Sequence, residues 1–537
     1  DTLLFHDKAG KPSCRDILES ISRAVWWNDV RLGKRLLDTT DLAKDIFTID
    51  AGRVRVLDFG YFERLYSFEK LSYLRAQESS LRTQLSGAPL ATRKQLKARI
   101  QASRRLQTIW WPNSRKLRLV GLRTTTTDGA PVLLSSPEDI QTELISAWQP
   151  VYSKRPVDED AVAKLLGVYK RNCSQHMDFA ELELAGLEEY VSFIKHTKPS
   201  AAGRNGIPYH GYKALPETSG FILKGVADYL SGCDLPEEGS LLDSFLGDFN
   251  EQDVSFAPKG FEKEDGISPS RSALNLRTIF LSNTDNKIIA GAQNRTIRPA
   301  VLALTPENQR GFCPGRQFGL NVVFLDTFHR VFNLISGFAE ETSAIGDCPI
   351  LALYDIANAF PTIAHVWLLA VLHAIDVNPR LRTLIRMLYH NTRAYSTGIG
   401  TNQFLFFVMA GVRTGCPLSA TLFLLAMNPF VYLLNTLSDG PKLSKSCLCA
   451  DDIGSALRAL KSLKVQYSIF QLAAKVSMMK LKPAKCYLVV SVSGLSDNLK
   501  YAIRQWLVQN IPQWQDYQIA PAAKYLGVFL GVALLLR

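Results

Sequence analysis

The order of apolar and polar residues predicts strands and helices in alternation over the second half of the chain. Residues 349–355, PILALYD, are a continuous apolar run that ends in an acid, which is typical of a buried strand whose last residue faces a site. Residues 416–437 form a long apolar segment with a proline near its start, a position that a helix tolerates. Short apolar runs on both sides of two acids predict a β-hairpin at 446–457.

Apolar residues at helical spacing then predict a helix over residues 460–479, and CYLVVSVS at 486–493 predicts another strand. The order strand, helix, hairpin, helix, strand implies an α+β sheet with helices packed on one side. In such a sheet, the acid that ends the first strand and the acids of the hairpin can converge. Residues 236–272 are acidic, punctuated by Gly, Pro and Ser, and without periodicity, which predicts a linker or long loop.

Composition places the chain among globular proteins, with 47% hydrophobic and 21% charged residues. At 537 residues it is too long for one ordinary core. The cysteines include no C-x-x-C pair and H-E-x-x-H is absent, so a structural zinc site has little support and reduced thiols in an intracellular compartment are favoured. No secretory signal opens the chain, and no apolar run reaches the roughly 18 residues that span a bilayer. The first residue is Asp1 rather than Met, and we expect a fragment of something longer.

Positive charge changes this picture, because the net charge is +12 and the helical first third holds a long stretch of one sign. Residues 79–127 contain no Asp or Glu, and Trp110 and Trp111 lie among the cations. Such a stretch is the expected footprint of a phosphate backbone, with a solvated helix face as the alternative. The candidate nucleic-acid contacts are Arg93, Lys94, Lys97, Arg99, Arg104 and Arg105.

Asp451 and Asp452 stand side by side at the tip of the predicted hairpin. Taken alone, such a pair is typical of a turn whose short side chains bond their own backbone. If Asp355 joins them, like charges about 4 Å apart repel by roughly 4 kcal/mol at an effective dielectric near 20. Two Mg²⁺ ions about 3.5–4 Å apart would reverse that sign and clamp the oxygens of a phosphoryl displacement. The residues alone leave a polymerase and a nuclease both open.

Eight motifs, in order along the chain, resemble those of the reverse transcriptase of non-LTR (LINE-type) retrotransposons, over about residues 185–530. KPSAAGRNGIPYHGYKAL is similar to the family's opening block, and LRTIFLSNTDNKIIAGAQNRTIRPAV and QRGFCPGRQFGLNV to its finger motifs. YDIANAFPTI resembles the first palm motif and GVRTGCPLSATLF the substrate-binding block. CADD resembles the catalytic hairpin, LKPAKC the motif after it, and KYLGV the primer grip.

The resemblance implies a right-hand polymerase of class α+β with these parts. We expect a helical basic N-terminal extension at 1–130, fingers at 131–345 with the acidic loop 236–272, a palm with the catalytic carboxylates at 346–495, and the primer-grip region and start of the thumb at 496–537. We expect the thumb to be largely missing from this fragment, and we find no signature of an endonuclease or of a Cys/His knuckle in these residues.

The implied activity is RNA-directed DNA synthesis, with two Mg²⁺ ions (or Mn²⁺) as cofactors. Asp355, Asp451 and Asp452 would hold the metal ions, and Asp452 has the alternative of orienting its neighbour or the turn. Lys485 would protonate the leaving pyrophosphate, with a solvated lysine as the alternative. The implied partners are an RNA template, a DNA primer or target, dNTPs and other domains of one longer polyprotein, with no membrane. The implied location is the nucleus, at the site of integration.

Further candidates come from the same motifs. The candidate substrate contacts are Phe360, Arg277, Lys287, Arg295, Arg413, Gly415 and Pro417. The candidate primer contacts are Lys524, Tyr525, Leu526 and Gly527. Arg277 is preferred for the triphosphate because arginine matches phosphate oxygens bidentately, and ordinary surface charge is its alternative. Phe360 lies where a ring would collide with a ribose 2′-hydroxyl, and its alternative is a plain core residue.

The chain also departs from the family's pattern. The departures are Cys449 for an aromatic residue, Thr414 for Gln, Ala420 for Pro, Pro361 for a second acid, and Asn205 for Asp. They put fidelity and rate in doubt more than the reaction. Two other readings stay open: a degenerate element product that binds RNA without polymerising, and a related RNA-dependent RNA polymerase or intron maturase. The intact acids speak against the first, and Phe360 with A-D-D rather than G-D-D speaks against the RNA polymerase.

Overall fold

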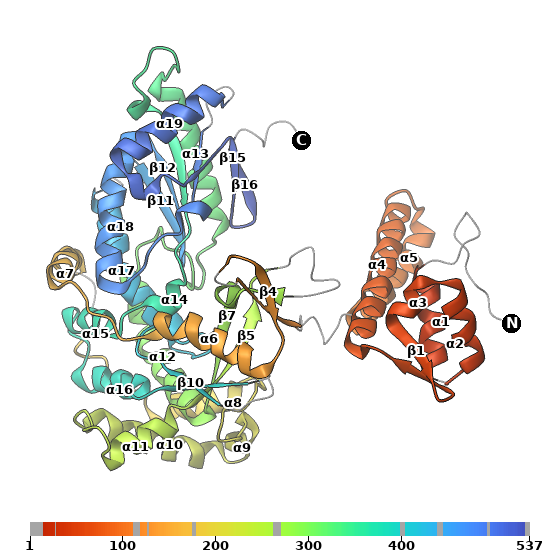
Figure 1. Ribbon diagram of the computed structural model, residues 1–537. Coiled ribbons are helices and arrows are strands. Elements are labelled where there is room, and N and C mark those ends of the chain that lie inside the picture. The colour runs from red at the N-terminus through yellow and green to blue at the C-terminus, as the bar shows by residue number, and fades with distance from the viewer. Residues whose placement is uncertain are drawn as a thin grey trace. The chain divides into compact units, whose positions relative to one another are not determined.

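The computed structural model describes residues 14–26, 28–110, 119–125, 128–173, 179–260, 270–397, 403–437, 444–490 and 495–531 (Figure 1). The chain forms two compact units: unit 1, Asp1–Glu143 with Phe256–Arg277, and unit 2, Leu144–Ser255 with Thr278–Arg537.

Unit 1 is mainly helical. Its helices are α1 (Cys14–Trp26), α2 (Val30–Thr39), α3 (Asp41–Ile46), α4 (Phe59–Ser86) and α5 (Leu90–Trp110), and a 3₁₀ turn follows at η3 (Ala273–Asn275). Its strands are the hairpin β1 (Phe47–Asp50) and β2 (Arg53–Val56) and the sheet of β4 (Pro131–Leu134), β3 (Gly121–Thr125) and β6 (Ser270–Arg271). Apolar side chains of α1 to α4 and of the β1–β2 hairpin form a small core, as their amphipathic spacing requires.

Helices α4 and α5 pack against each other as an antiparallel helical hairpin. Asp58 caps α4, because its carboxylate accepts a hydrogen bond from the Tyr61 backbone N–H at 2.9 Å. Between the helices, Ser103 Oγ donates to the Leu74 carbonyl at 3.2 Å. Leu74 and Ile100 are buried, so one stripe of each helix faces the other and the opposite stripes face solvent.

Unit 2 is organised around a five-stranded sheet. The strands, in spatial order, are β11 (Ser444–Cys449), β12 (Asp452–Leu457), β8 (Ile350–Tyr354), β13 (Tyr487–Val489) and β14 (Gln518–Ala520). Neighbours are antiparallel except for the parallel pair β13 and β14. All five residues of β8 are buried, as a strand with both faces covered requires. The predicted first strand and hairpin are confirmed. Within the predicted strand 486–493, residues Tyr487–Val489 form β13, and residues 491–493 lie outside the described residues.

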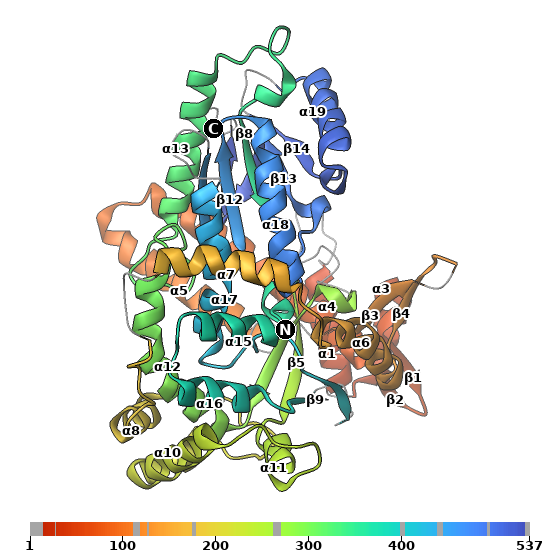
Figure 2. The same cartoon turned by 90° about the vertical axis from the view of Figure 1, so that its left-hand side faces the viewer.

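Both faces of this sheet are covered, so the prediction of helices on one side is wrong. On one face, Ile350, Ala352 and Tyr354 pack against α17 (Ser419–Leu437), α18 (Leu463–Ser477) and α19 (Asp497–Asn510). On the other, Leu351 and Leu353 pack against α13 (Gly319–Ser336) and the hairpin of β15 (Ala522–Tyr525) and β16 (Val528–Gly531). Figure 2 shows α13 and α18 on opposite sides of the strands. The buried run of β8 already signalled two covered faces, since alternate side chains point to opposite sides.

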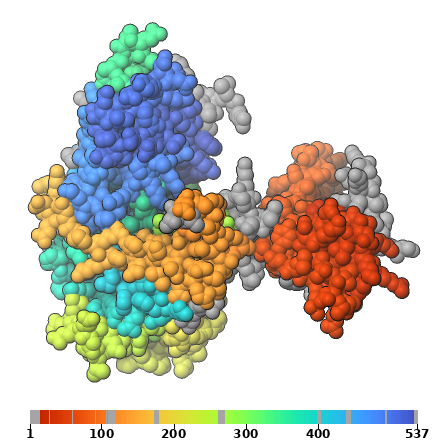
Figure 3. All heavy atoms as spheres, in the orientation of Figure 1, coloured from red at the N-terminus to blue at the C-terminus, as the bar shows by residue number. Residues whose placement is uncertain are grey.

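The remaining elements of unit 2 surround this centre. The helices are α7 (Glu159–Cys173), α8 (Leu187–His196), α9 (Tyr209–Ala214), α10 (Pro216–Gly232), α11 (Leu241–Phe249), α12 (Thr284–Leu304), α14 (Ala359–Thr362), α15 (His365–Ala374) and α16 (Pro379–Tyr389). The 3₁₀ turns are η4 (Ile345–Asp347), η5 (Leu460–Ser462), η6 (Pro483–Lys485) and η7 (Pro512–Trp514). α7 packs on α17 and α18 and lies on the surface of the unit (Figure 3).

A second sheet has the order β10 (Phe404–Phe407), β9 (Arg393–Ser396), β5 (Gln252–Pro258) and β7 (Leu276–Ser282). Strands β5 and β7, like α6 (Pro137–Tyr152), contain residues of both units. The prediction of a linker or loop at 236–272 is wrong for residues 241–258, because α11 and β5 form there, and residues 261–269 lie outside the described residues. Ser240 caps α11, and Leu246 and Val254 are buried. Acids interrupt the apolar positions of these elements and hid their periodicity.

Helix α17 is the one helix of the described residues that is long and apolar enough to cross a membrane. However, 78% of its window Ser419–Thr436 is buried inside the fold. It is the core helix that the sequence predicted.

Candidate active site

The three acids lie at one edge of the five-stranded sheet. Asp355 directly follows β8, and the register pairs Tyr354 with Ile453 of the neighbouring β12. One further step of this antiparallel register sets Asp355 beside Asp452, the first residue of β12. Cys449 pairs with Asp452 across the hairpin, so Ala450 and Asp451 form its two-residue turn. The structure therefore brings together the acids that the sequence separates by almost a hundred positions.

The carboxylates act on one another electrostatically. The pKa of Asp452 is raised to about 6, first by burial and then by the negative charges of Asp451 and Asp355. The side chain still reaches the surface, so the burial is partial: protein packed around the carboxylate removes only part of its water. Burial raises the pKa of the neighbouring Cys449 thiol, and the negative charges of Asp452 and Asp451 raise it further.

A divalent cation fits this edge by its chemistry, because aspartate oxygens are its preferred ligands and its charge would relieve the repulsion. The side chains are not assembled around one point, however: over the described ranges, no group of three or more His, Cys, Asp or Glu residues is placed to hold a metal ion. The acids are adjacent, and a bound ion would have to draw them together.

Gln309 supports the turn that contains Asp451. This fully buried side chain accepts hydrogen bonds from the backbone N–H groups of Ala450 at 2.8 Å and Gly311 at 2.9 Å. Its amide also donates to the Ala450 carbonyl at 3.1 Å. Ala450 has a left-handed backbone with a φ of 59°, which a residue other than glycine adopts at a cost. A Cβ at Gly311 would lie 2.0 Å from the Ala450 nitrogen, so only glycine fits there.

Two further side chains bond to backbone carbonyls of the β11–β12 hairpin. Asn321, fully buried on α13, donates to the Leu448 carbonyl at 2.9 Å. The Tyr525 hydroxyl lies 3.3 Å from the carbonyls of both Cys447 and Asp452. These contacts satisfy backbone groups of the strands and fix the hairpin that carries the acids.

Asp355 is anchored through its backbone. Its N–H donates to Cys486 Sγ at 3.3 Å, and its carbonyl accepts from the Lys482 N–H at 2.9 Å. Lys485 ends η6 in the same segment, and its side chain is exposed. The lysine thus lies in the turn just before β13, the strand that pairs with β8, and its predicted role as an acid stays a prediction.

Phe360 lies five residues after Asp355 in the short helix α14, and its side chain is half-buried. Its ring stacks on Phe423 of α17, with centroids 4.4 Å apart and planes 6° from parallel. Its carbonyl accepts from the Val412 N–H at 2.9 Å, which joins this turn to the predicted substrate block. A half-buried position fits a ring that is packed on Phe423 and partly exposed.

The predicted substrate block bends sharply at Gly415, whose φ is +114°. A Cβ there would lie 2.5 Å from the Phe280 carbonyl oxygen, so a larger residue would push against β7. Gly415 is exposed, and Pro417 is half-buried just before α17. Both shape the backbone here and neither offers a polar side chain, and their predicted role as substrate contacts stays a prediction.

The structure separates the predicted cationic contacts into two groups. Arg277 and Arg295 are exposed, and Arg295 lies over the Phe193 ring at 5.6 Å. Lys287 is only 7% exposed and donates to the Ala201 carbonyl at 3.0 Å. Burial lowers the pKa of Lys287, which Asp285 partly offsets. The prediction that Lys287 contacts a triphosphate is therefore wrong for this structure, because its ammonium is already bonded inside the fold.

The predicted roles of Arg413 and Tyr525 are also wrong for this structure. Arg413 is fully buried, with its guanidinium 4.4 Å from the Tyr389 ring centre, so it is neither a surface charge nor an exposed substrate contact. Tyr525 is 4% exposed and supports the hairpin instead of touching nucleic acid. Lys524 and Gly527 are exposed and Leu526 is half-buried, at the turn between β15 and β16.

The predicted nucleic-acid contacts of unit 1 lie on α5. Arg93, Lys94, Lys97 and Arg99 are exposed. Arg104 instead pairs with Glu78 of α4 at 2.9 Å, and Arg82 pairs with the same carboxylate. Glu78 lies one residue before the acid-free stretch and was therefore not counted with it. Because Arg104 forms an ion pair with Glu78, its predicted role as a nucleic-acid contact is not supported. The side chain of Arg105 and residue Trp111 lie outside the described residues.

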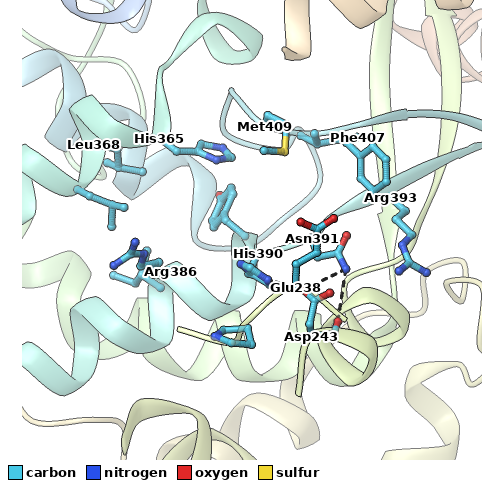
Figure 4. Close-up of a pocket in the computed structure, with 15 residues that line it drawn as sticks. Glu238, Asp243, His365, Leu368, Arg386, His390, Asn391, Arg393, Phe407 and Met409 are labelled. Carbon is cyan, nitrogen blue, oxygen red and sulfur yellow. Dashed lines mark hydrogen bonds and ion pairs between the residues drawn. The ribbon is translucent and has the colours of Figure 1, made fainter. Parts of the chain in front are cut away.

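A cavity of about 710 Å³ opens elsewhere in unit 2 (Figure 4). Its polar lining includes His365, His390, Asn391 and Arg393, and Asn391 points toward Asp243 (Figure 4). None of the three acids or of the predicted substrate contacts lines it. The cavity is thus separate from the acidic edge.

Comparison with known proteins agrees with this geometry. The sequence pattern of the family described as reverse transcriptase (RNA-dependent DNA polymerase) matches residues 262–530, half of the chain. These residues include all three acids, Phe360 and the supporting Gln309. The chain belongs to the reverse transcriptase family.

Two curated relatives come from mobile elements. The chain is 25% identical over 417 residues to an uncharacterized 149 kDa protein of transposon TX1 from Xenopus laevis, covering 75% of the chain and 28% of that protein. It is also 25% identical over 219 residues to a retrovirus-related Pol polyprotein of the type-1 retrotransposable element R2 from Nasonia vitripennis, covering 38% of the chain and 21% of that protein. Both are non-LTR elements, so the resemblance drawn from the motifs is confirmed. The chain spans about a quarter of the length of these relatives.

Sequence reasoning missed the residues that hold the site. Gln309, Asn321 and Cys486 all bond to backbone, and no spacing rule predicts which polar side chain a fold buries against which carbonyl. A signal for Gln309 was available, since it opens a motif that the resemblance had already singled out.

Proposed function

We propose that the chain is the RNA-directed DNA polymerase of a non-LTR retrotransposon, with the five-stranded sheet as its palm and the preceding elements of unit 2 within its fingers. The observation that carries the proposal is the edge where Asp355 meets Asp451 and Asp452, within the residues that match the family. The primer 3′-hydroxyl attacks the α-phosphate of a dNTP. A new P–O bond forms, the bond between the α-phosphorus and the bridging oxygen breaks, and pyrophosphate leaves.

The residues divide this work. Asp355 and Asp451 would hold divalent cations, Mg²⁺ by preference, and Asp452 either joins them or sets the turn. When bound, the ions supply positive charge to the oxygens that attack and leave. Lys485 stands on the neighbouring segment as the candidate donor of a proton to pyrophosphate. Gln309 and Asn321 keep the hairpin fixed, so the acids need no rearrangement of the backbone to act.

Substrate choice is assigned to two features. The exposed Arg277 and Arg295 are candidate triphosphate contacts. Phe360, stacked on Phe423 and half-buried, would exclude a ribose 2′-hydroxyl. The exposed cations of α5 would bind the phosphates of an RNA template.

The experiment is primer extension by the purified chain on an RNA template, first with dNTPs and then with NTPs. We expect extension with dNTPs and little with NTPs. Extension with NTPs alone would favour the RNA polymerase alternative. Binding of RNA without any extension would favour the degenerate product instead.

A further inference from the structure

The segment of residues 309–312, between α12 and α13, touches two parts of the candidate active site at once. Its first residue, Gln309, bonds both backbone groups of Ala450 in the turn that carries Asp451. Its last residue, Phe312, lies against the ring of Phe360. A segment of four residues thus spans the distance between the catalytic turn and the candidate gate.

Phe360 contacts two other rings, one that stacks on it and one that lies beside the stacked pair. The face of Phe423 lies 4.4 Å from it by ring centroids, and Phe312 meets it edge-on at 5.5 Å with planes 75° apart. Phe312 also meets Phe423 edge-on at 6.3 Å. Phe423 is fully buried on α17, whereas Phe312 is 41% exposed. Such edge-to-face geometry is preferred by aromatic pairs and fixes ring positions.

The backbone of Phe312 is strained, with a φ of +59°, a conformation that a bulky residue rarely adopts. Strain of this kind persists where the surroundings hold it. Here Arg298 donates to the Phe312 carbonyl at 3.2 Å. The Arg316 guanidinium donates to two backbone carbonyls of the loop that follows α12, that of Thr305 at 2.8 Å and that of Gln309 at 2.9 Å. The loop therefore places the Phe312 ring firmly.

We propose that Phe312 is a positioning residue for sugar selection: it keeps Phe360 against Phe423, at a fixed place relative to the turn of Asp451. This inference rests on the proposed function and deepens it. Removal of the Phe312 ring frees Phe360 to tilt away from the 2′ carbon of the substrate, which admits a ribonucleotide. The turn itself keeps its bonds to Gln309, so use of dNTPs continues.

The decisive variant is Phe312→Gly, which removes the ring and also the strain of a left-handed phenylalanine, so folding is retained. We measure kcat and KM for a dNTP and the matching NTP on one primer and RNA template, together with Tm. We expect the preference for dNTP in kcat/KM to fall roughly tenfold. The kcat for dNTP and Tm should stay close to those of the unmodified chain. Phe312→Tyr keeps the ring and should restore the preference.

The matched control is Phe318→Ala, which removes an aromatic side chain that is also exposed, 57%, and lies six residues further on. It should leave the preference unchanged. If the unmodified chain extends primers and Phe312→Gly discriminates as well as it does, this inference alone is overturned. A parallel loss for both nucleotides with a lower Tm overturns it too, since that is a packing role. If the unmodified chain extends no primer, the proposed function fails and this inference falls with it.

Discussion

The α4–α5 and β11–β12 hairpins hold their charged residues in opposite ways. In the helical hairpin, Glu78 is matched by Arg82 and Arg104, while other cations of α5 remain exposed. In the β-hairpin, neutral side chains such as Gln309 and Asn321 bond to the backbone beneath the acids. In the helical hairpin the carboxylate is neutralised by ion pairs. In the β-hairpin, neutral hydrogen bonds hold the backbone, and these two side chains do not neutralise the charges of the acids, as the proposed binding of cations requires. The comparison suggests that the first region tolerates change better than the second.

The largest effect should come from the β-hairpin. Asp451→Asn removes a charge that the cations need, so primer extension should fall by at least about 10³-fold, equivalent to roughly 4 kcal/mol. RNA binding should persist, because the exposed cations are unchanged. Asp497→Asn, at an exposed helix start, is the control and should extend normally. Near-normal extension by Asp451→Asn would show that the metal assignment is wrong.

Phe360→Ala tests the gate beside the acids. We expect kcat/KM for NTPs to rise while that for dNTPs changes little, because the discrimination is steric. A residue that serves only as core would behave differently: its truncation should cost about 3–5 kcal/mol of stability and lower both activities together. Kinetics with both nucleotides and Tm on the same variant separate these outcomes.

The helical hairpin should give a graded response. The variant replaces Arg93, Lys94, Lys97 and Arg99 with Ala. RNA affinity should fall, and each lost phosphate contact should reduce the log–log salt slope by roughly 0.7. The control replaces four exposed cations of α2 and β2, namely Arg31, Lys34, Arg35 and Arg53. Equal slopes for the two variants would mean that α5 is an ordinary solvated face.

Tyr525→Phe should have a smaller effect, since it removes only a hydroxyl at 3.3 Å from two carbonyls. The expected cost is about 1 kcal/mol of stability, with a few-fold loss of extension and no change in RNA affinity. Tyr501→Phe, 67% exposed on α19, should change nothing. A loss of affinity for the DNA primer in Tyr525→Phe would restore its predicted role as a primer contact.

The smallest effect concerns acid pH. Hydrogen bonds from Arg82, Gln107 and Arg104 lower the pKa of Glu78 from 4.5 to about 2. Its folded pKa is below the unfolded value, so its stabilisation is complete above pH 4.5 and is lost as pH falls toward 2. Hydrogen exchange of α4 and α5 should therefore speed up over this window, and Glu78→Gln should remove that dependence. An unchanged profile in the variant would assign it to other groups.

The sequence was informative where apolar residues follow one another with little interruption. The buried run of β8 and the apolar length of α17 predicted those elements correctly. It was less informative at 236–272, because acids interrupt the apolar positions of α11 and β5. The acids of the site could be predicted from motif order, but Lys287, Arg413 and Tyr525 were misassigned. Each of these side chains is buried, and whether a polar side chain is buried depends on tertiary packing, which a local sequence pattern does not contain.

The bonds of Tyr525 bear on the order in which the site is made during synthesis. Its hydroxyl bonds to the carbonyls of Cys447 and Asp452, which are 78 and 73 residues earlier in the chain. β14, at the sheet's edge, also comes late, at Gln518–Ala520. A ribosome releases the N-terminal part first, and contacts between distant residues form slowly. The two bonds from Tyr525 are therefore added only after residue 525 has emerged. A nascent chain that stops before this point carries all three acids, with the hairpin held by Gln309 and Asn321 but not by Tyr525.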